Sequence, residues 1–446
     1  MIRQIIVNGF KTLTEFEMDF KPGLNILVGP NGSGKTNIIS FFEFLGYLQD
    51  MNIPDAISKS GGAGSILTKI AENKYQNSIS ATITGTVKLG YKRYLYYQYH
   101  FRILLRETGE SIVYSDQKLM IKLRTVESIA QQRIHDYDLV IGLNINANSN
   151  VVPAISKINE NLKELNRPYD SPHKLSKDEI TKRIKQTLTS LDPDESIISR
   201  LRMICRAFYY PIYADIHGGQ VYNIEPSKAK TPDDSAKTPG VGKDGSGLYS
   251  TLYALTKTKK NRRQNVFFRP FFSSSRYRED ATLENILKYT RLANKWITNI
   301  NVTNNAFDQQ LRVRVVLQGL INTSTILPLS SMSDGTVKWI SLVTIILTNQ
   351  TMFAIEEPEN YLHPLMLSEL ISIMRAHMKK DRFVIMSTHS ETLLNNAVPE
   401  EIIVISYTNG KTTAKRIPNA EALSEEIRNT GFGLGYYYIS GSVGDE

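Results

Sequence analysis

L-N-I-L-V-G-P-N-G-S-G-K-T-N-I-I-S, residues 24–40, is the stretch that decides the fold. An apolar run leads into G-P-N-G-S-G-K-T at positions 29–36, and an apolar segment compatible with a helix follows. The pattern G-x-x-x-x-G-K-[ST] between a strand and a helix is typical of a phosphate-binding loop. Its glycines let backbone amides turn toward phosphates, and the helix adds its positive dipole end. The stretch therefore predicts an α/β domain that binds a nucleotide.

The side chains of this loop have predicted roles. We expect Lys35 to reach the β- and γ-phosphates and the Thr36 hydroxyl to be a ligand of Mg²⁺. The other nucleotide contacts are predicted at Pro30, Asn31, Gly32, Ser33, Gly34 and Asn37.

A second candidate segment lies at residues 329–340, L-S-S-M-S-D-G-T-V-K-W-I. Its polar part opens an apolar, helix-like stretch. A serine and a glycine at a helix N-terminus offer a hydroxyl and bare amides to a phosphate. Serine and aspartate also cap ordinary helices, so both readings remain open for Ser333, Asp334 and Gly335.

Two further apolar runs end in residues suited to hydrolysis. T-M-F-A-I-E-E-P-E-N-Y-L-H-P at 351–364 ends in paired acids, and R-F-V-I-M-S-T-H-S at 382–390 ends in a histidine. We assign Glu356 to Mg²⁺ and Glu357 to the attacking water. The C-terminal edge of a parallel sheet is where ligands bind, so His389 is a candidate contact to the γ-phosphate or the water.

These motifs in this order resemble the ABC-type ATPase heads of the SMC and RecF class, and most closely the stand-alone RecF-like and OLD-like ATPases of bacterial anti-phage defence and DNA-repair loci. The opening I-I-V-N-G-F-K-T-L is similar to the start of such heads. The resemblance spans roughly residues 1–100 and 310–410 and implies an ABC-type P-loop ATPase head that uses ATP and Mg²⁺. It makes Lys35 and Thr36 the Walker A site, Glu356 and Glu357 the Walker B site, Ser333 to Gly335 the signature and His389 the switch histidine.

The resemblance has further implications. In such heads the signature acts on the nucleotide of another copy, which implies an ATP-dependent homodimer or a larger symmetric oligomer. The Walker B aspartate of the class is here Glu356, and the signature lacks a second glycine. Gln76 and Gln98 are both candidates for the Q-loop glutamine. Only about 36 residues follow position 410, so we expect no nuclease domain of the OLD type.

The rest of the chain predicts three parts. Residues 1–110 are the first half of the head, with antiparallel strands near 78–105, and 266–446 are the second half. Between them, 111–265 predicts a mostly helical, basic insertion, with helices near 155–166, 177–190 and 195–207. Inside it, 225–247 predicts a mobile loop because large apolar residues are nearly absent. The Gly- and Tyr-rich tail, 431–441, is either a docking patch or a strand and turn on the core.

Composition limits the class of protein. The 446 residues include one cysteine, Cys205, which excludes an internal disulfide and fits a reducing cytoplasm. No apolar run is long enough for a membrane span. Residues 151–270 hold 21 Lys and Arg against 13 Asp and Glu, so they carry +8 of the net +9. This excess, and the cluster 257–263, is either a solvated face or a DNA-binding surface.

Two functions therefore remain open. One is an ATPase sensor or scaffold of an anti-phage system that controls a separate effector, with a nuclease as the candidate, through protein contacts. The other is a RecF-like repair or recombination ATPase that uses the basic region on DNA. A transporter motor is disfavoured because the chain has a long insertion and no membrane segment.

Overall fold

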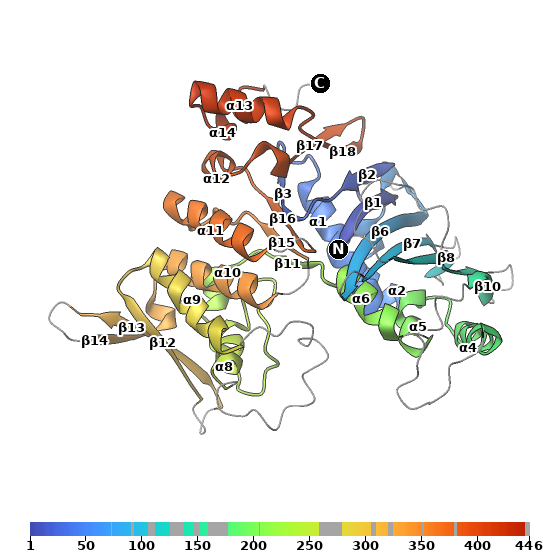
Figure 1. Ribbon diagram of the computed structural model, residues 1–446, viewed down its shortest axis with the longest axis horizontal. Helices are drawn as coiled ribbons and strands as arrows, with labels where there is room; N and C mark the ends of the chain where they lie inside the picture. The colour runs from blue at the N-terminus through green and yellow to red at the C-terminus, as the bar shows by residue number, and fades with distance from the viewer. Residues whose placement is uncertain are drawn as a thin grey trace. The chain divides into compact units, whose positions relative to one another are not determined.

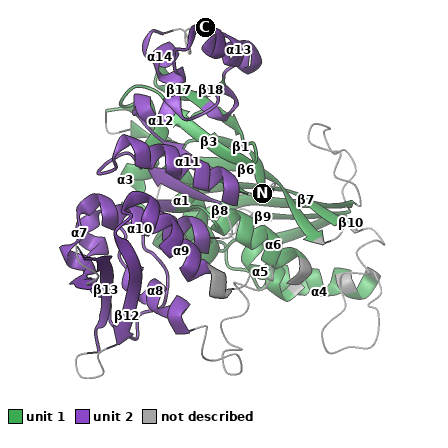
Figure 2. Ribbon diagram, turned by 60° about the vertical axis from the view of Figure 1, so that its left-hand side comes forward, with its two compact units in different colours: residues 1–220, 380–383, 403–416 green, residues 221–379, 384–402, 417–446 purple. Residues whose placement is uncertain are grey.

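The computed structural model describes residues 1–441 except 73, 91–92, 106–111, 125–137, 146–150, 159–176, 205, 258–278, 305–308, 320–323, 350–351 and 379–380. The chain forms two compact units, coloured separately in Figure 2. Unit 1 comprises residues 1–220, 380–383 and 403–416, and unit 2 comprises 221–379, 384–402 and 417–446. Both units are therefore assembled from segments far apart in the sequence.

An antiparallel sheet forms one layer of unit 1, with strand order β10-β9-β8-β7-β6-β1-β2. Its strands in chain order are β1 Ile2–Asn8, β2 Phe16–Asp19, β6 Ser78–Gly90, β7 Arg93–Leu105, β8 Ile112–Arg124, β9 Leu139–Ile145 and β10 Val151–Ile158. Alternate residues of β7 point into the core, where Tyr97, Tyr99 and Phe101 are buried. This period of two is the expected signature of a sheet with one covered face.

The phosphate loop of unit 1 lies between β3, Gly23–Val28, and α1, Lys35–Asp50 (Figure 1). β3 neighbours β17, Ile402–Thr408, which pairs antiparallel with β18, Lys411–Arg416. Phe10, from the turn after β1, stacks on Phe44 of α1 with ring centroids 5.5 Å apart. The remaining elements of unit 1 are α2 Ile53–Lys59, α3 Ala63–Ile66, β4 Lys69–Ala71, β5 Lys74–Tyr75, α4 Lys177–Thr189, α5 Ile197–Ile204 and α6 Arg206–His217.

Unit 2 has a parallel pair of strands with helices beside it. β15, Phe353–Glu356, pairs in parallel with β16, Phe383–Ser387, and β11, Gln220–Tyr222, borders β15. The parallel pair brings the ends of both strands to one edge, since Glu356 is in register with Ser387. The unit also holds the antiparallel sheet of β12 Ile297–Asn304, β13 Leu311–Gln318 and β14 Ser324–Pro328.

Unit 2 contains the helices from α7 to α14, of which Figure 1 labels α8 to α14. They are α7 Pro226–Ala229, α8 Leu248–Lys257, α9 Glu279–Ala293, α10 Asp334–Thr348, α11 Pro364–His377, α12 Glu391–Asn395, α13 Ala420–Thr430 and α14 Leu434–Ile439. α10 is buried along most of its length and includes the fully buried Trp339. Among the helices in the described part of the chain, none is long and apolar enough to cross a membrane.

The α/β class and the antiparallel layer are confirmed, but the first part of the predicted helical insertion is wrong. Residues 112–124, 139–145 and 151–158 are the strands β8, β9 and β10. In β8, Leu119 and Ile121 are buried and alternate with more exposed neighbours, a period of two that the abundance of Leu and Lys concealed. The rest of the helix expected near 155–166, residues 159–166, lies outside the described residues.

The other helices expected in the insertion, near 177–190 and 195–207, correspond to α4 and to α5 with the start of α6. The division into domains 1–110, 111–265 and 266–446 stays a prediction. The tail 431–441 forms the helix α14 rather than a strand, with Leu434 and Tyr437 buried. Its glycines supply the helix boundary: Gly431 ends α13 in a left-handed conformation at φ 75°.

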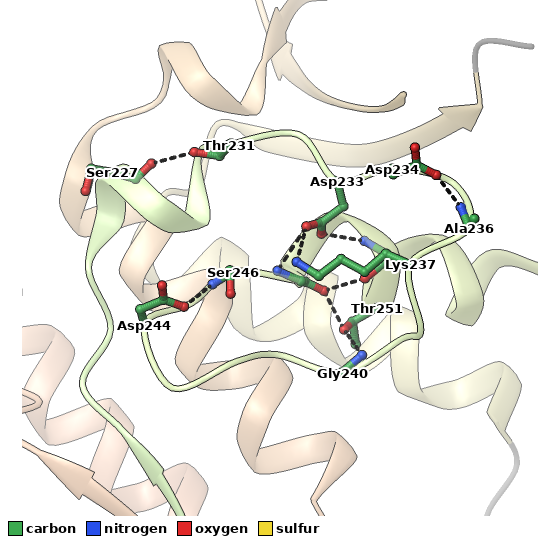
Figure 3. Close-up of polar contacts among 12 residues, drawn as sticks. Ser227, Thr231, Asp233, Asp234, Ala236, Lys237, Gly240, Asp244, Ser246 and Thr251 are labelled. Atoms are coloured by element: carbon green, nitrogen blue, oxygen red, sulfur yellow. Dashed lines mark hydrogen bonds and ion pairs between the residues drawn. The ribbon is translucent and has the colours of Figure 1, made fainter. Parts of the chain in front are cut away.

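The expected mobile loop 225–247 is instead held by hydrogen bonds (Figure 3). The carboxylate of Asp233, 5% exposed, accepts bonds from the backbone N–H groups of Gly247 and Ser250 at 3.2 and 3.1 Å. Lys237 adds an ion pair of 2.6 Å to Asp233. The prediction of mobility rested on the polar composition of this loop. In the structure, hydrogen bonds of polar side chains join the loop to α8 in place of apolar contacts.

Candidate nucleotide site

The phosphate loop in unit 1 has the backbone of an anion cradle. Gly32 and Gly34 have φ of 81° and 106°, which glycine adopts without strain. A Cβ at position 32 would have open space around it, whereas one at position 34 would lie 2.1 Å from Thr412 Oγ1. Pro30, Asn31 and Gly32 are exposed, so the outer side of the loop is accessible.

Lys35 and Thr36 begin α1 at the end of this loop. The Lys35 ammonium donates to the carbonyls of Gly29 and Pro30, at 2.7 and 3.0 Å, and is therefore folded onto the loop that it serves. The Thr36 side chain is on the exposed side. The hydroxyl oxygen of Ser33 is buried and, in the part of the chain that the structure describes, has no hydrogen-bond partner. These groups fit a polyphosphate with Mg²⁺, because the Lys35 ammonium, the Ser33 hydroxyl and the N-terminus of α1 lie at one loop.

A chain of side-chain hydrogen bonds supports the loop from behind. Asn37 Nδ2 lies 2.7 Å from Thr12 Oγ1, which lies 2.6 Å from Thr412 Oγ1, which in turn lies 3.1 Å from the Ser33 carbonyl oxygen. An amide N–H only donates and a carbonyl only accepts, so both hydroxyls must donate in the same direction. Asn37, predicted as a nucleotide contact, therefore uses its amide to hold Thr12.

The signature residues of unit 2 lie at the start of α10. The Ser333 hydroxyl is the N-cap and accepts from the Thr336 N–H at 3.3 Å. Asp334, with a side chain 52% exposed, forms an ion pair of 2.6 Å with Lys230. Gly335 is required by close packing, because a Cβ there would lie 2.6 Å from the carbonyl oxygen of Tyr361. Capping and phosphate binding thus remain compatible at Ser333.

The paired acids of unit 2 leave the end of β15. Glu356 is half-buried, whereas Glu357 is exposed with a left-handed φ of 44°. The Glu357 N–H donates to the Ser387 carbonyl at 3.0 Å, and its carboxylate accepts from Asn360 at 3.0 Å. The loop from Glu357 to Tyr361 is therefore anchored to the end of β16.

His389 follows β16 and is exposed, as a contact to a ligand requires. Its backbone N–H and the Thr388 hydroxyl both donate to one oxygen of Glu359, at 3.0 and 2.7 Å. Unit 2 thus brings the signature residues, the paired acids and the histidine segment together through the loop after β15.

Sequence reasoning missed several supporting residues. Thr12 and Thr412 lie 400 positions apart, and no local pattern signals their contact. Glu359 was visible in I-E-E-P-E but received no role. Lys338 lies within an apolar helical stretch. A lysine among apolar residues is seldom buried without a partner, so its position indicates a specific role. Of the two candidate Q-loop glutamines, Gln98 lies within β7 and Gln76 follows β5.

Two family models match overlapping parts of this chain. A family model described as "AAA domain, putative AbiEii toxin, Type IV TA system" matches residues 134–395, and a second, described as an AAA domain, matches residues 4–204. The second range contains the phosphate loop, and the first contains the signature, the paired acids and His389.

Curated relatives match a short stretch. A DNA replication and repair protein RecF of Aliivibrio fischeri is 37% identical over 46 residues, 10% of this chain and 13% of that protein. A DNA double-strand break repair Rad50 ATPase of Nanoarchaeum equitans is 44% identical over 39 residues, 9% of this chain and 5% of that protein. The chain thus matches a small part of the length of these relatives.

Two solved SMC head structures align with most of this chain at TM-scores below 0.5. An SMC head bound to the C-terminal winged-helix domain of ScpA covers 94% of this chain and 99% of its own, with a TM-score of 0.47 and 13% identity. An SMC head domain from Thermotoga maritima gives a TM-score of 0.39 at 11% identity, covering 93% of this chain and 98% of its own.

Proposed function

This chain belongs to the AAA-domain ATPase family whose model covers residues 134–395, and on that premise we propose that it is the sensor or scaffold ATPase of a bacterial anti-phage defence system. The observation that carries this proposal is the family description, which names a toxin of a type IV toxin–antitoxin system. ATP-dependent association of two copies would control a separately encoded effector, for which a nuclease is our candidate. The site of action is the cytoplasm.

The proposed chemistry assigns a task to each group. Lys35 and the loop amides compensate the charge of the triphosphate, and Thr36 with Glu356 would hold Mg²⁺. When bound, Mg²⁺ neutralises charge on the β- and γ-phosphates. Glu357 orients the attacking water and takes its proton, and His389 hydrogen-bonds the γ-phosphate or that water. The exposure of Glu357 and His389 supports roles in contact with substrate.

The signature supports self-association. Ser333 and Gly335 are proposed to contact the nucleotide of a second copy, as the resemblance to ABC-type heads implies. Hydrolysis would then switch the pair from an associated to a released state, because ATP would stabilise only the associated one.

The test uses the Glu357→Gln and Lys35→Ala variants. Glu357→Gln keeps the size of the side chain but removes the base, so it should bind ATP, fail to hydrolyse it and accumulate as a dimer in light scattering. Lys35→Ala should lose ATP binding or turnover and remain unassociated, because it removes a charge that compensates phosphate. A Glu357→Gln variant that hydrolyses ATP at the wild-type rate would falsify the catalytic assignment.

A RecF-like ATPase acting on DNA is the second candidate. The short matches to RecF and Rad50 and the charge excess in 151–270 favour it. Residues 258–263 of the basic cluster lie outside the described residues. Stimulation of the ATPase rate by linear duplex DNA, lost as salt rises, would support this candidate, because binding to DNA phosphates releases counterions. A rate indifferent to DNA would favour regulation by a protein effector.

A further inference from the structure

Lys338 is a buried cation in the helix that begins with the signature. The residue is 1% exposed, and its ammonium donates to the carbonyl oxygen of Glu357 at 3.2 Å. The same ammonium lies 5.7 Å from the centre of the Tyr361 ring. Burial lowers the pKa of Lys338 to about 8, while the carboxylates of Glu359 and Glu357 oppose this shift.

A lysine at such a position is difficult to explain by stability. Taking an ammonium out of water is costly, and an apolar residue of similar size would fill the same space without this cost. The adjacent positions of α10, Val337 and Trp339, are also fully buried and carry apolar side chains. A buried charge that costs stability therefore points to a functional role for Lys338.

The residue that Lys338 contacts has a strained backbone. Glu357 and Tyr361 both adopt left-handed φ values, 44° and 68°, that are uncommon for side chains with a Cβ. Glu357 is held at its N–H by the Ser387 carbonyl and at its carboxylate by Asn360. Lys338 supplies the third contact, to the Glu357 carbonyl. The N–H, the carbonyl and the carboxylate of Glu357 thus each have a hydrogen-bond partner, and these partners hold the left-handed backbone in place.

The same loop is pressed against the first turn of α10. Gly335 packs so closely that a Cβ would lie 2.6 Å from the Tyr361 carbonyl oxygen. Two independent contacts, at Gly335 and Lys338, therefore join the signature helix to the loop that carries the base. A shift of α10 would be felt directly by the Glu357 backbone, because packed interiors transmit displacement.

We propose that Lys338 is a positioning residue for Glu357, which couples the signature segment to the carboxylate that activates water. The inference rests on the role proposed above for Glu357. In this proposal Lys338 acts through the Glu357 carbonyl, to which its ammonium donates. Its removal should therefore lower kcat while the affinity for ATP, set by the phosphate loop, stays unchanged.

The primary test compares Lys338→Met with Lys338→Arg. Lys338→Met keeps the length of the side chain and removes the donor, so kcat should fall at least about tenfold, since small misplacements of catalytic groups are costly. KM should stay within about twofold, and the melting temperature should match or exceed that of the wild type, because a buried charge is gone. Lys338→Arg, which still donates, should retain more activity than Lys338→Met.

Ser341→Ala is the matched control on the same helix. Ser341 is fully buried and donates to the Val337 carbonyl at 2.9 Å within α10. The variant disturbs the helix without removing a contact to the loop, so its kcat should equal that of the wild type. Equal losses in Ser341→Ala and Lys338→Met would show a general effect of helix packing and would overturn the proposal.

A double variant decides whether Lys338 acts through Glu357. The single-turnover rate of Glu357→Gln with Lys338→Met should be no slower than that of Glu357→Gln alone, because effects of groups acting as one unit do not multiply. Multiplied losses, or a wild-type kcat in Lys338→Met beside an inactive Glu357→Gln, would overturn this inference alone. A wild-type rate in Glu357→Gln would overturn the proposed function together with it.

Discussion

Replacing Thr412 by valine tests whether the phosphate loop depends on the hydrogen-bonded chain behind it. Thr412 is 1% exposed, and its hydroxyl lies between Thr12 Oγ1 and the Ser33 carbonyl oxygen, at 2.6 and 3.1 Å. Valine has nearly the same shape, so the core keeps its packing and only the two bonds disappear. The backbone bond from the Thr412 N–H to the Thr12 carbonyl, at 3.0 Å, remains.

The expected loss follows from the two bonds. The Ser33 carbonyl would be left buried without this partner, which costs about 1–3 kcal/mol, and the bond to the half-buried Thr12 is worth about 0.5–1.5 kcal/mol. Together the two contributions lower the expected free energy of unfolding by about 1.5–4.5 kcal/mol. If ATP binding must restore the loop at a cost of about 1–2 kcal/mol, the dissociation constant rises roughly 5- to 30-fold.

Urea unfolding and equilibrium binding of a fluorescent ATP analogue measure the two effects. The control is Thr413→Val, the same substitution at the exposed neighbour in β18, which should leave both quantities unchanged. The reasoning is refuted if Thr412→Val unfolds within about 0.5 kcal/mol of the wild type, the range of ordinary surface changes, and binds ATP with the same affinity.

Three other outcomes are expected. Gly34→Ala should weaken ATP binding far more than Gly32→Ala, because both incur backbone strain of about 1–2 kcal/mol but only position 34 places a Cβ 2.1 Å from Thr412 Oγ1; equal affinities in a binding titration would contradict this. Lys338 has a lowered pKa, so the native state releases its proton near pH 8 while the unfolded state keeps it to about 10.5. Wild-type stability in urea should therefore rise relative to Lys338→Met between these values, by at most about 1.4 kcal/mol per pH unit, and a constant difference would be the contrary result. Lys230→Met should leave stability within about 0.5 kcal/mol, since an exposed ion pair contributes little, yet weaken ATP-dependent dimerisation in light scattering because Asp334 then repels phosphate. Asp334→Asn in the same chain should restore the dimer, and a failure of this rescue would exclude charge compensation.

The fold could be predicted from the sequence where the signal is local. Residues 24–40 contain an apolar strand, a glycine-rich loop and the start of a helix within 17 residues. Each of these parts indicates a phosphate-binding loop. The strands at 112–158 were missed because lysines and leucines satisfy both a helical and an alternating period, and only the pairing of β8 with β7 decides between them. Tertiary pairing thus overrode an ambiguous local pattern.

The candidate site shows the same limit. The phosphate loop, paired acids and histidine each end or follow an apolar strand, so their chemistry could be predicted from short motifs. Thr412 and Lys338 act through contacts with the loop and the Glu357 carbonyl, and such contacts leave no pattern in the neighbouring sequence. Asn37 is a related case, because its place beside Lys35 suggested a ligand contact while its amide is used by Thr12.

The separation of Thr12 from Thr412 in the sequence also has a consequence during synthesis of the protein. A ribosome that adds about 5–20 residues per second delivers Thr412 about 20–80 s after Thr12, since 400 positions lie between them. During that interval the nascent chain carries its phosphate loop without the hydroxyl that completes the support. ATP binding by unfinished chains should therefore be weaker until β18 has emerged from the ribosome.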